Sequence, residues 1–86
     1  MHRIHHLLAC ALLAASLAAC SKVTVENYNR LEPGMPYATV QQILGKPTRC
    51  SDVLTVRSCT WGDDRRNITV NFVADQVVLF TSENIR

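Results

Sequence analysis

Histidine is missing from most of this chain. All three histidines lie within residues 2–6, so residues 20–86 contain none. Histidine is the usual general base and a frequent metal ligand at neutral pH, and its absence excludes serine or cysteine nucleophiles that a histidine activates. The only clustered carboxylates, Asp63 and Asp64, follow a glycine in a pattern typical of a solvated turn. We therefore expect no catalytic residues and no metal site.

Other chemical signatures are also lacking. The three glycines stand apart from one another, so there is no glycine-rich loop to bind phosphate. The four cysteines include no Cys-x-x-Cys redox pair and no set of zinc ligands. The formal net charge is only +2, and the largest basic cluster is the pair Arg65-Arg66. We therefore expect no cofactor and no binding to nucleic acid.

The first 19 residues differ in composition from the rest. Residues 7–19 are apolar apart from Ser16, and the short segment before them carries Arg3. Such an apolar segment is shorter than the roughly 20 residues of a transmembrane helix but fits the centre of a signal peptide. The sequence therefore predicts that residues 1–19 are a signal peptide for export.

The end of this apolar segment is more specific than the segment itself. It reads Leu17-Ala18-Ala19-Cys20, which resembles the lipobox of bacterial lipoproteins at all four positions. In that family the cysteine becomes the first residue of the mature chain and carries a diacylglycerol, and its amino group is acylated, for example with palmitate. The resemblance implies a lipid anchor at Cys20. With Ser21 next, it implies the periplasmic face of the outer membrane, with the inner membrane as the alternative.

The cysteine count agrees with this assignment. Cys10 lies in the removed segment and lipidation occupies Cys20, which leaves Cys50 and Cys59. Export to an oxidising compartment allows these two to form a disulfide. A bridge of this span is worth roughly 2.5–3 kcal/mol in the chain-entropy model, which is a large share of the stability of so small a domain.

The chain after Cys20 predicts helices first and strands second. Residues 20–24 form a tether, and residues 25–86 form one domain. Thr24 can cap a helix over residues 25–31, and Pro33-Gly34 is typical of a type II turn. Pro36 suits the first turn of a second helix, which ends at Gly45 before Pro47 and has Val40, Ile43 and Leu44 on its apolar face.

Beyond Pro47 the hydrophobic period changes from 3.6 to 2, which indicates strands. We expect strands over residues 49–53, 57–61, 67–73 and 76–82. An antiparallel sheet with its apolar face packed on the two helices is an α+β fold.

Two motifs in this region resemble a known family. Gly34-Met35 is followed by Leu44-Gly45-Lys46-Pro47, then by Trp61 and by Val-Asn-Phe at residues 70–72. This pattern is similar to that of the SmpA/OmlA (BamE-like) small lipoproteins, and closest to the related small lipoproteins of unknown function, over about residues 24–80. Pro36 stands where the family often has threonine, and Ala74-Asp75 where it often has Asn-Gly. The resemblance implies two helices and a three- or four-stranded antiparallel sheet, the fold of the β-lactamase inhibitor proteins.

These observations predict a non-enzymatic lipoprotein with an accessory or scaffold role in envelope integrity or outer-membrane protein assembly. Its expected partners are membrane lipid, through acylated Cys20, and another envelope protein. Gly34, Met35 and Trp61 are candidate contacts for that protein, although Met35 and Trp61 also suit the core. The alternative function is an inhibitor of a periplasmic hydrolase of the β-lactamase type, or a binding module.

Overall fold

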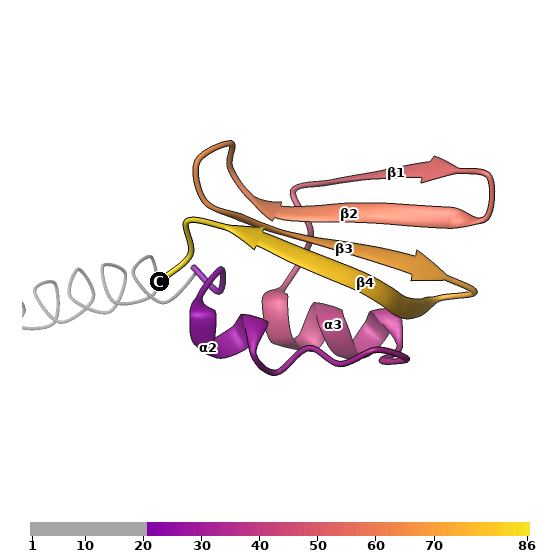
Figure 1. The fold of residues 1–86 in the computed structure, drawn as a ribbon, viewed down its shortest axis with the longest axis horizontal. Helices are drawn as coiled ribbons and strands as arrows, with labels where there is room; N and C mark the ends of the chain where they lie inside the picture. Colours follow the sequence, from indigo (N-terminus) through magenta and orange to yellow (C-terminus); the bar gives the residue numbers. More distant parts are fainter. Residues whose placement is uncertain (1–20) are drawn as a thin grey trace, which may run out of the picture.

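The computed structural model describes residues 21–86, so the predicted signal peptide and the predicted lipidation site, Cys20, lie outside the described residues. Two short helices are followed by a four-stranded antiparallel sheet of order β1-β2-β3-β4, which confirms the predicted α+β fold (Figure 1). The elements are α2 (Val25–Tyr28), α3 (Tyr37–Leu44), β1 (Arg49–Val53), β2 (Val56–Gly62), β3 (Asn67–Val73) and β4 (Gln76–Glu83). Within the described range, no helix has the length and apolarity needed to cross a bilayer.

Helix α2 begins where the sequence predicts and ends earlier. The Thr24 hydroxyl accepts a hydrogen bond of 3.1 Å from the backbone N–H of Asn27, as expected of an N-cap. The prediction of a helix to Leu31 is wrong, because α2 ends at Tyr28. The N–H of Leu31 donates instead to the carbonyl of Tyr28, a tighter i to i+3 turn that brings the Leu31 side chain into the core.

Helix α3 has the predicted apolar face. Val40, Ile43 and Leu44 are all buried, and the chain leaves the helix through Gly45 at a positive φ of 83°. Pro36 was expected in the first turn but lies just outside it as the N-cap, with an extended backbone (ψ 149°). It is held extended because it forms a bridge with Gln76.

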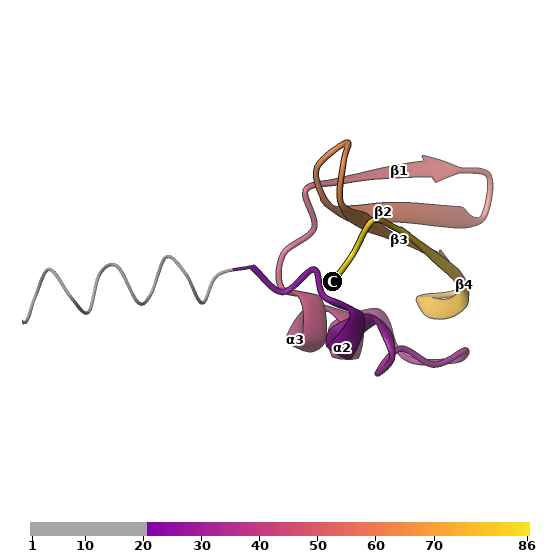
Figure 2. The same cartoon turned by 60° about the vertical axis from the view of Figure 1, so that its left-hand side comes forward.

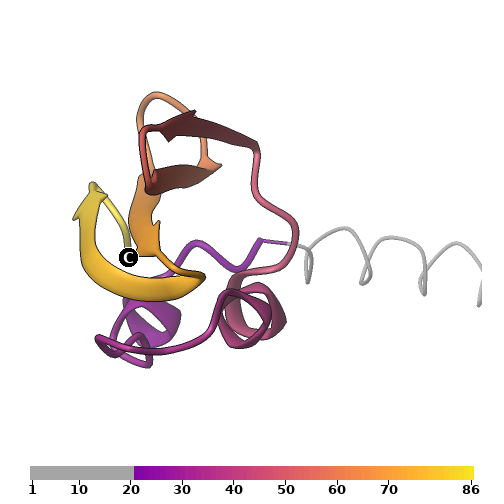
Figure 3. The same cartoon turned by 90° about the vertical axis from the view of Figure 1, so that its right-hand side faces the viewer.

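The sheet matches the predicted strands to within one residue. In β3, Ile68, Val70 and Phe72 are each at most 1% exposed and face the helices, while the intervening residues are half-buried. The helices cover only this face of the sheet (Figure 3). The buried hydrophobic residues are Leu31, Val40, Ile43, Leu44, Cys59, Trp61, Ile68, Val70, Phe72 and Val77.

The two ends of the sheet differ in what they carry. The turns Leu54-Thr55 and Ala74-Asp75 lie together at one end, which we name the tip end (Figure 1). The turn of residues 63–66, the first described residues and the C-terminus lie at the other, the base end (Figures 1 and 2). A chain segment that precedes Ser21 therefore joins the domain at the base end.

Candidate functional site

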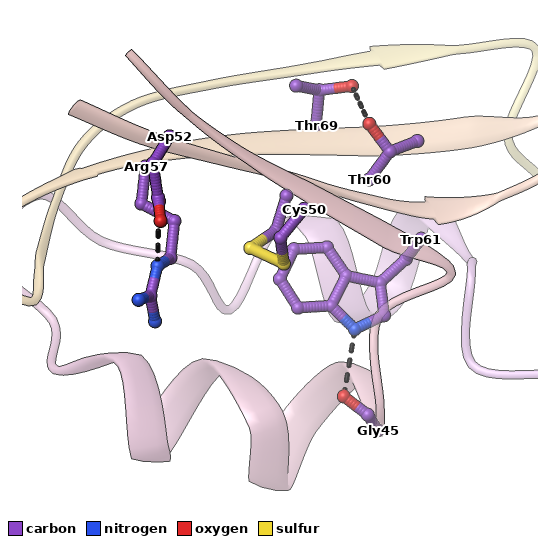
Figure 4. The surroundings of a disulfide bond; sticks show 8 residues. Gly45, Cys50, Asp52, Arg57, Thr60, Trp61 and Thr69 are labelled. Carbon is purple, nitrogen blue, oxygen red and sulfur yellow. Dashed lines mark hydrogen bonds and ion pairs between the residues drawn. A yellow bond between two sulfur atoms is a disulfide. The ribbon is translucent and has the colours of Figure 1, made fainter. Parts of the chain in front are cut away.

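The predicted disulfide is present between the first two strands. Cys50 and Cys59 are directly opposite in the register of β1 and β2, and their sulfur atoms are 2.06 Å apart (Figure 4). Cys59 is fully buried, whereas Cys50 lies on a strand whose five residues are all exposed. The bridge therefore fastens an exposed edge strand to the hydrophobic core.

Trp61 is a core residue. Its side chain is 1% exposed, and its indole Nε1–H donates a 2.8 Å hydrogen bond to the carbonyl oxygen of Gly45 at the end of α3 (Figure 4). The bond pairs the indole N–H and also satisfies a carbonyl at the helix C-terminus. Trp61 thus joins β2 to α3 and presents no surface to a partner.

Gly34 and Met35 lie at the tip end, away from Trp61. Gly34 has a φ of 85°, and the N–H of Met35 donates to the carbonyl of Glu32 at 3.2 Å, as the predicted type II turn requires. The N–H of Gly34 donates to the carbonyl of Val77, whose own N–H donates to the carbonyl of Met35. The structure therefore does not bring the three candidate contacts together, and two of them line the start of β4.

This pairing closes the outer edge of β4. Besides the two bonds at Val77, the Tyr28 hydroxyl donates to the carbonyl of Phe80 at 3.2 Å. Beyond the end of β4, the N–H of Val25 donates to the carbonyl of Arg86 at 3.0 Å. The sequence motif around Gly34 gave no sign of this role, because an edge is covered by contacts between residues far apart in the chain.

The opposite edge of the sheet, β1, is open. All five of its residues are exposed, and within residues 21–86 it pairs only with β2. Unpaired strand edges carry backbone N–H and C=O groups that can pair with another chain, and most proteins cover them. Sequence analysis missed this feature, because which strand ends at an edge depends on the topology.

The tip end combines apolar exposure with backbone strain. Leu54 is 97% exposed and has a φ of 56°, and its neighbours Val53 and Val56 are 66% and 36% exposed. Ala74 and Asp75, in the turn beside it, also have positive φ values, of 49° and 66°. Residues other than glycine, asparagine and aspartate rarely adopt such angles, which the two-residue turns of these hairpins require.

An ion pair between Asp52 and Arg57 lies next to the Leu54-Thr55 turn. The Arg57 Nε donates to the Asp52 carboxylate at 3.1 Å (Figure 4). The guanidinium lies 5.8 Å from the centre of the Tyr37 ring. The hydrogen bond to Asp52 and the negative charge of that carboxylate raise the pKa of Arg57 above its ordinary value. The side chains of Arg57 and Asp52 are 47% and 65% exposed, so the pair contributes little stability.

The base end is built around Asp63. Its carboxylate accepts hydrogen bonds of 2.9 Å from the backbone N–H groups of Arg66 and Arg65, and these bonds lower its pKa. Gly62 precedes this turn with a φ of 102°, and a Cβ there would overlap the Arg66 carbonyl. Asp63 is therefore an ionised turn-forming residue, as its sequence context indicates.

Comparisons leave the family open. No group of three or more metal-ligating side chains occurs in the part of the chain that the structure describes. No protein family, curated protein or solved structure matches the chain. The resemblance to the BamE-like lipoproteins therefore stays a prediction from sequence motifs.

Proposed function

We propose that this protein is a non-enzymatic lipoprotein, anchored through acylated Cys20 at the periplasmic face of the outer membrane. There it acts as an accessory or scaffold for another envelope protein. The sequence supports this through the four-residue lipobox at the end of an apolar segment. Two or more acyl chains hold a protein stably on a membrane without a transmembrane helix.

The placement of the first described residues carries the proposal. Val23 packs against the hydrophobic core, so only Ser21 and Lys22 separate Cys20 from the folded domain. An anchor at Cys20 therefore holds the base end at the membrane. The tip end and most of the open β1 edge then point away from the lipid, where a partner can reach them.

Crosslinking in cells tests the proposal. The tagged full chain is crosslinked, recovered from isolated outer membranes and identified with its attached proteins by mass spectrometry. We expect a specific envelope protein with the wild type and much less of it with Cys20→Ser, because the variant is no longer held at the membrane. An identical set of attached proteins from both, or none above background, would contradict the proposal.

A hydrolase inhibitor is the second candidate, and the exposed Leu54 favours it. The residue stands at the end of a hairpin that the disulfide braces, which suits insertion into an enzyme cleft. Purified protein is added at micromolar concentration to β-lactamases and to lysozyme. Inhibition that Leu54→Asp abolishes would support this function, whereas full enzyme activity in every assay would remove it.

A further inference from the structure

We propose that β1 is a docking edge for an extended segment of a partner polypeptide, which adds to the sheet as a fifth strand antiparallel to β1. The inference rests on the proposed function and deepens it, because it names the surface and the chemistry of the partner. Strand addition obtains affinity from main-chain hydrogen bonds and specificity from alternate side chains.

The two edges of the sheet differ in whether other parts of the chain form hydrogen bonds to them. Along β4, the Gly34–Tyr37 segment and the Tyr28 hydroxyl bond to the outer edge, and past the end of the strand the Val25 amide bonds to Arg86. Along β1, no described segment other than β2 takes up the backbone groups. The strand contains no proline and no lysine, and of its two charged residues Asp52 is paired with Arg57, which leaves Arg49.

The disulfide shows which backbone groups face outward. The Cα atoms of Cys50 and Cys59 are 4.0 Å apart, the close spacing of a pair that exchanges no hydrogen bonds in an antiparallel ladder. The N–H and C=O of Cys50 therefore point away from β2. Because the pattern alternates, the same holds for Asp52, whereas Ser51 bonds to β2. Cys50 and Asp52 thus offer two donors and two acceptors to an added strand.

The side chains of β1 define the segment that fits. Arg49, Ser51 and Val53 share the face of the sheet that no helix covers, and Arg49 forms no ion pair with any described residue. Asp52, on the other face, is already paired with Arg57. An antiparallel partner strand should therefore place an apolar residue opposite Val53, a small polar residue opposite Ser51 and a carboxylate opposite Arg49. Read from its N-terminus, the segment is apolar–x–polar–x–acidic.

A second copy of this chain fits the edge less well. Two β1 strands can join their sheets symmetrically only by running antiparallel about an axis normal to the sheet. The base end of one copy then lies beside the tip end of the other. Lipid anchors at the two Cys20 residues would then lie at opposite ends of the joined sheet. They could not both insert into the same membrane surface. The occupant is therefore another polypeptide.

Amide hydrogen exchange measured by NMR tests the proposal on the full chain in detergent micelles. The probe is the peptide Gly-Val-Thr-Ser-Thr-Glu-Gly. In the free protein, the amides of Cys50 and Asp52 should exchange quickly and those of Ser51 and Val53 slowly. Saturating peptide should slow exchange at Cys50 and Asp52 by about tenfold or more. A peptide with lysine in place of glutamate should bind several-fold more weakly.

Two variants of one residue separate backbone pairing from side-chain effects. Asp52→Pro removes an outward N–H without removing a bond to β2, and proline is tolerated at such edge positions. Asp52→Ala is the matched control, because it also loses the ion pair with Arg57 but keeps the N–H. Circular dichroism and the intact disulfide verify that both fold. We expect peptide affinity to fall about tenfold in Asp52→Pro relative to Asp52→Ala, as for one or two lost hydrogen bonds.

Three outcomes would overturn the inference. They are equal affinity in the two variants, absence of peptide binding by the wild type, and a dimer that Asp52→Pro dissociates, which would assign the edge to a second copy. Peptide binding in micelles does not depend on acylation of Cys20. Failure here is therefore distinguishable from failure of the proposed function, which membrane attachment and crosslinking in cells report.

Discussion

Removal of the Cys50–Cys59 disulfide should weaken this domain strongly. The bridge joins residues nine apart in sequence. For a closed loop of about ten residues, the chain-entropy model gives about 2.7 kcal/mol at 25 °C. In domains of this size, 1 kcal/mol shifts Tm by about 4–8 °C, so we expect a fall of about 10–20 °C.

The variant is chosen so that little else changes. Cys50 is exposed and tolerates serine, whereas Cys59 is fully buried, where a serine hydroxyl would lack a partner. The double variant Cys50→Ser with Cys59→Ala is therefore compared with the wild type by thermal unfolding, followed by circular dichroism. Reductant should lower the Tm of the wild type towards that of the variant and leave the variant unchanged, which controls for effects of the reductant itself.

Amide exchange gives a second measure of this effect. The Val70 amide in the middle of β3 should exchange only when the whole domain unfolds, so a loss of about 2.7 kcal/mol should speed its exchange about 100-fold on reduction. The Ser51 amide, which faces β2, should also exchange faster, because no side chain of β1 is buried and the bridge joins this strand to the core. The reasoning is refuted if reduced and oxidised protein melt within about 2 °C of each other, or if Val70 keeps its protection on reduction.

Three further predictions follow from single residues. Leu54→Gly should stabilise the domain by about 0.5–1 kcal/mol, because glycine adopts a positive φ without strain and the exposed leucine side chain makes no buried contact that would be lost. A lower urea midpoint would contradict this. Trp61→Phe should cost about 1–3 kcal/mol in thermal unfolding, since it loses the hydrogen bond to Gly45 and some core volume, and an unchanged Tm would show that the bond is dispensable. The lowered pKa of Asp63 means that its ionised form stabilises the turn. The advantage of the wild type over Asp63→Ala should be complete above pH of about 4 and disappear as the pH falls through the pKa of the folded state, and a Tm difference constant down to pH 2 would exclude this origin.

The sequence predicted the elements of the fold closely because its local signals agree with one another. The alternation of Ile68, Val70 and Phe72 is a period-2 signal that only a half-buried strand satisfies. Gly45, followed by Pro47, predicts the end of α3, and Gly45 has the expected positive φ at that position. The pairing of Cys50 with Cys59 was also confirmed.

The features of the surface were not predictable in this way, because they depend on tertiary contacts. The turn Leu54-Thr55 contains no glycine, asparagine or proline, so no turn signal marked its strained first residue. The sequence favours a core position for Trp61 over a surface one, but it does not predict that the indole N–H bonds to the carbonyl of Gly45. The cover on β4 and the open edge of β1 follow from strand order, which the sequence motifs do not encode.

Acylation of Cys20 tests the central claim most directly. Cells expressing the tagged full chain are grown with radiolabelled palmitate, and the protein is isolated from separated inner and outer membranes. The account predicts label in the wild type, found in the outer-membrane fraction, and neither label nor membrane attachment in Cys20→Ser. An unlabelled wild-type protein in the soluble fraction would contradict it.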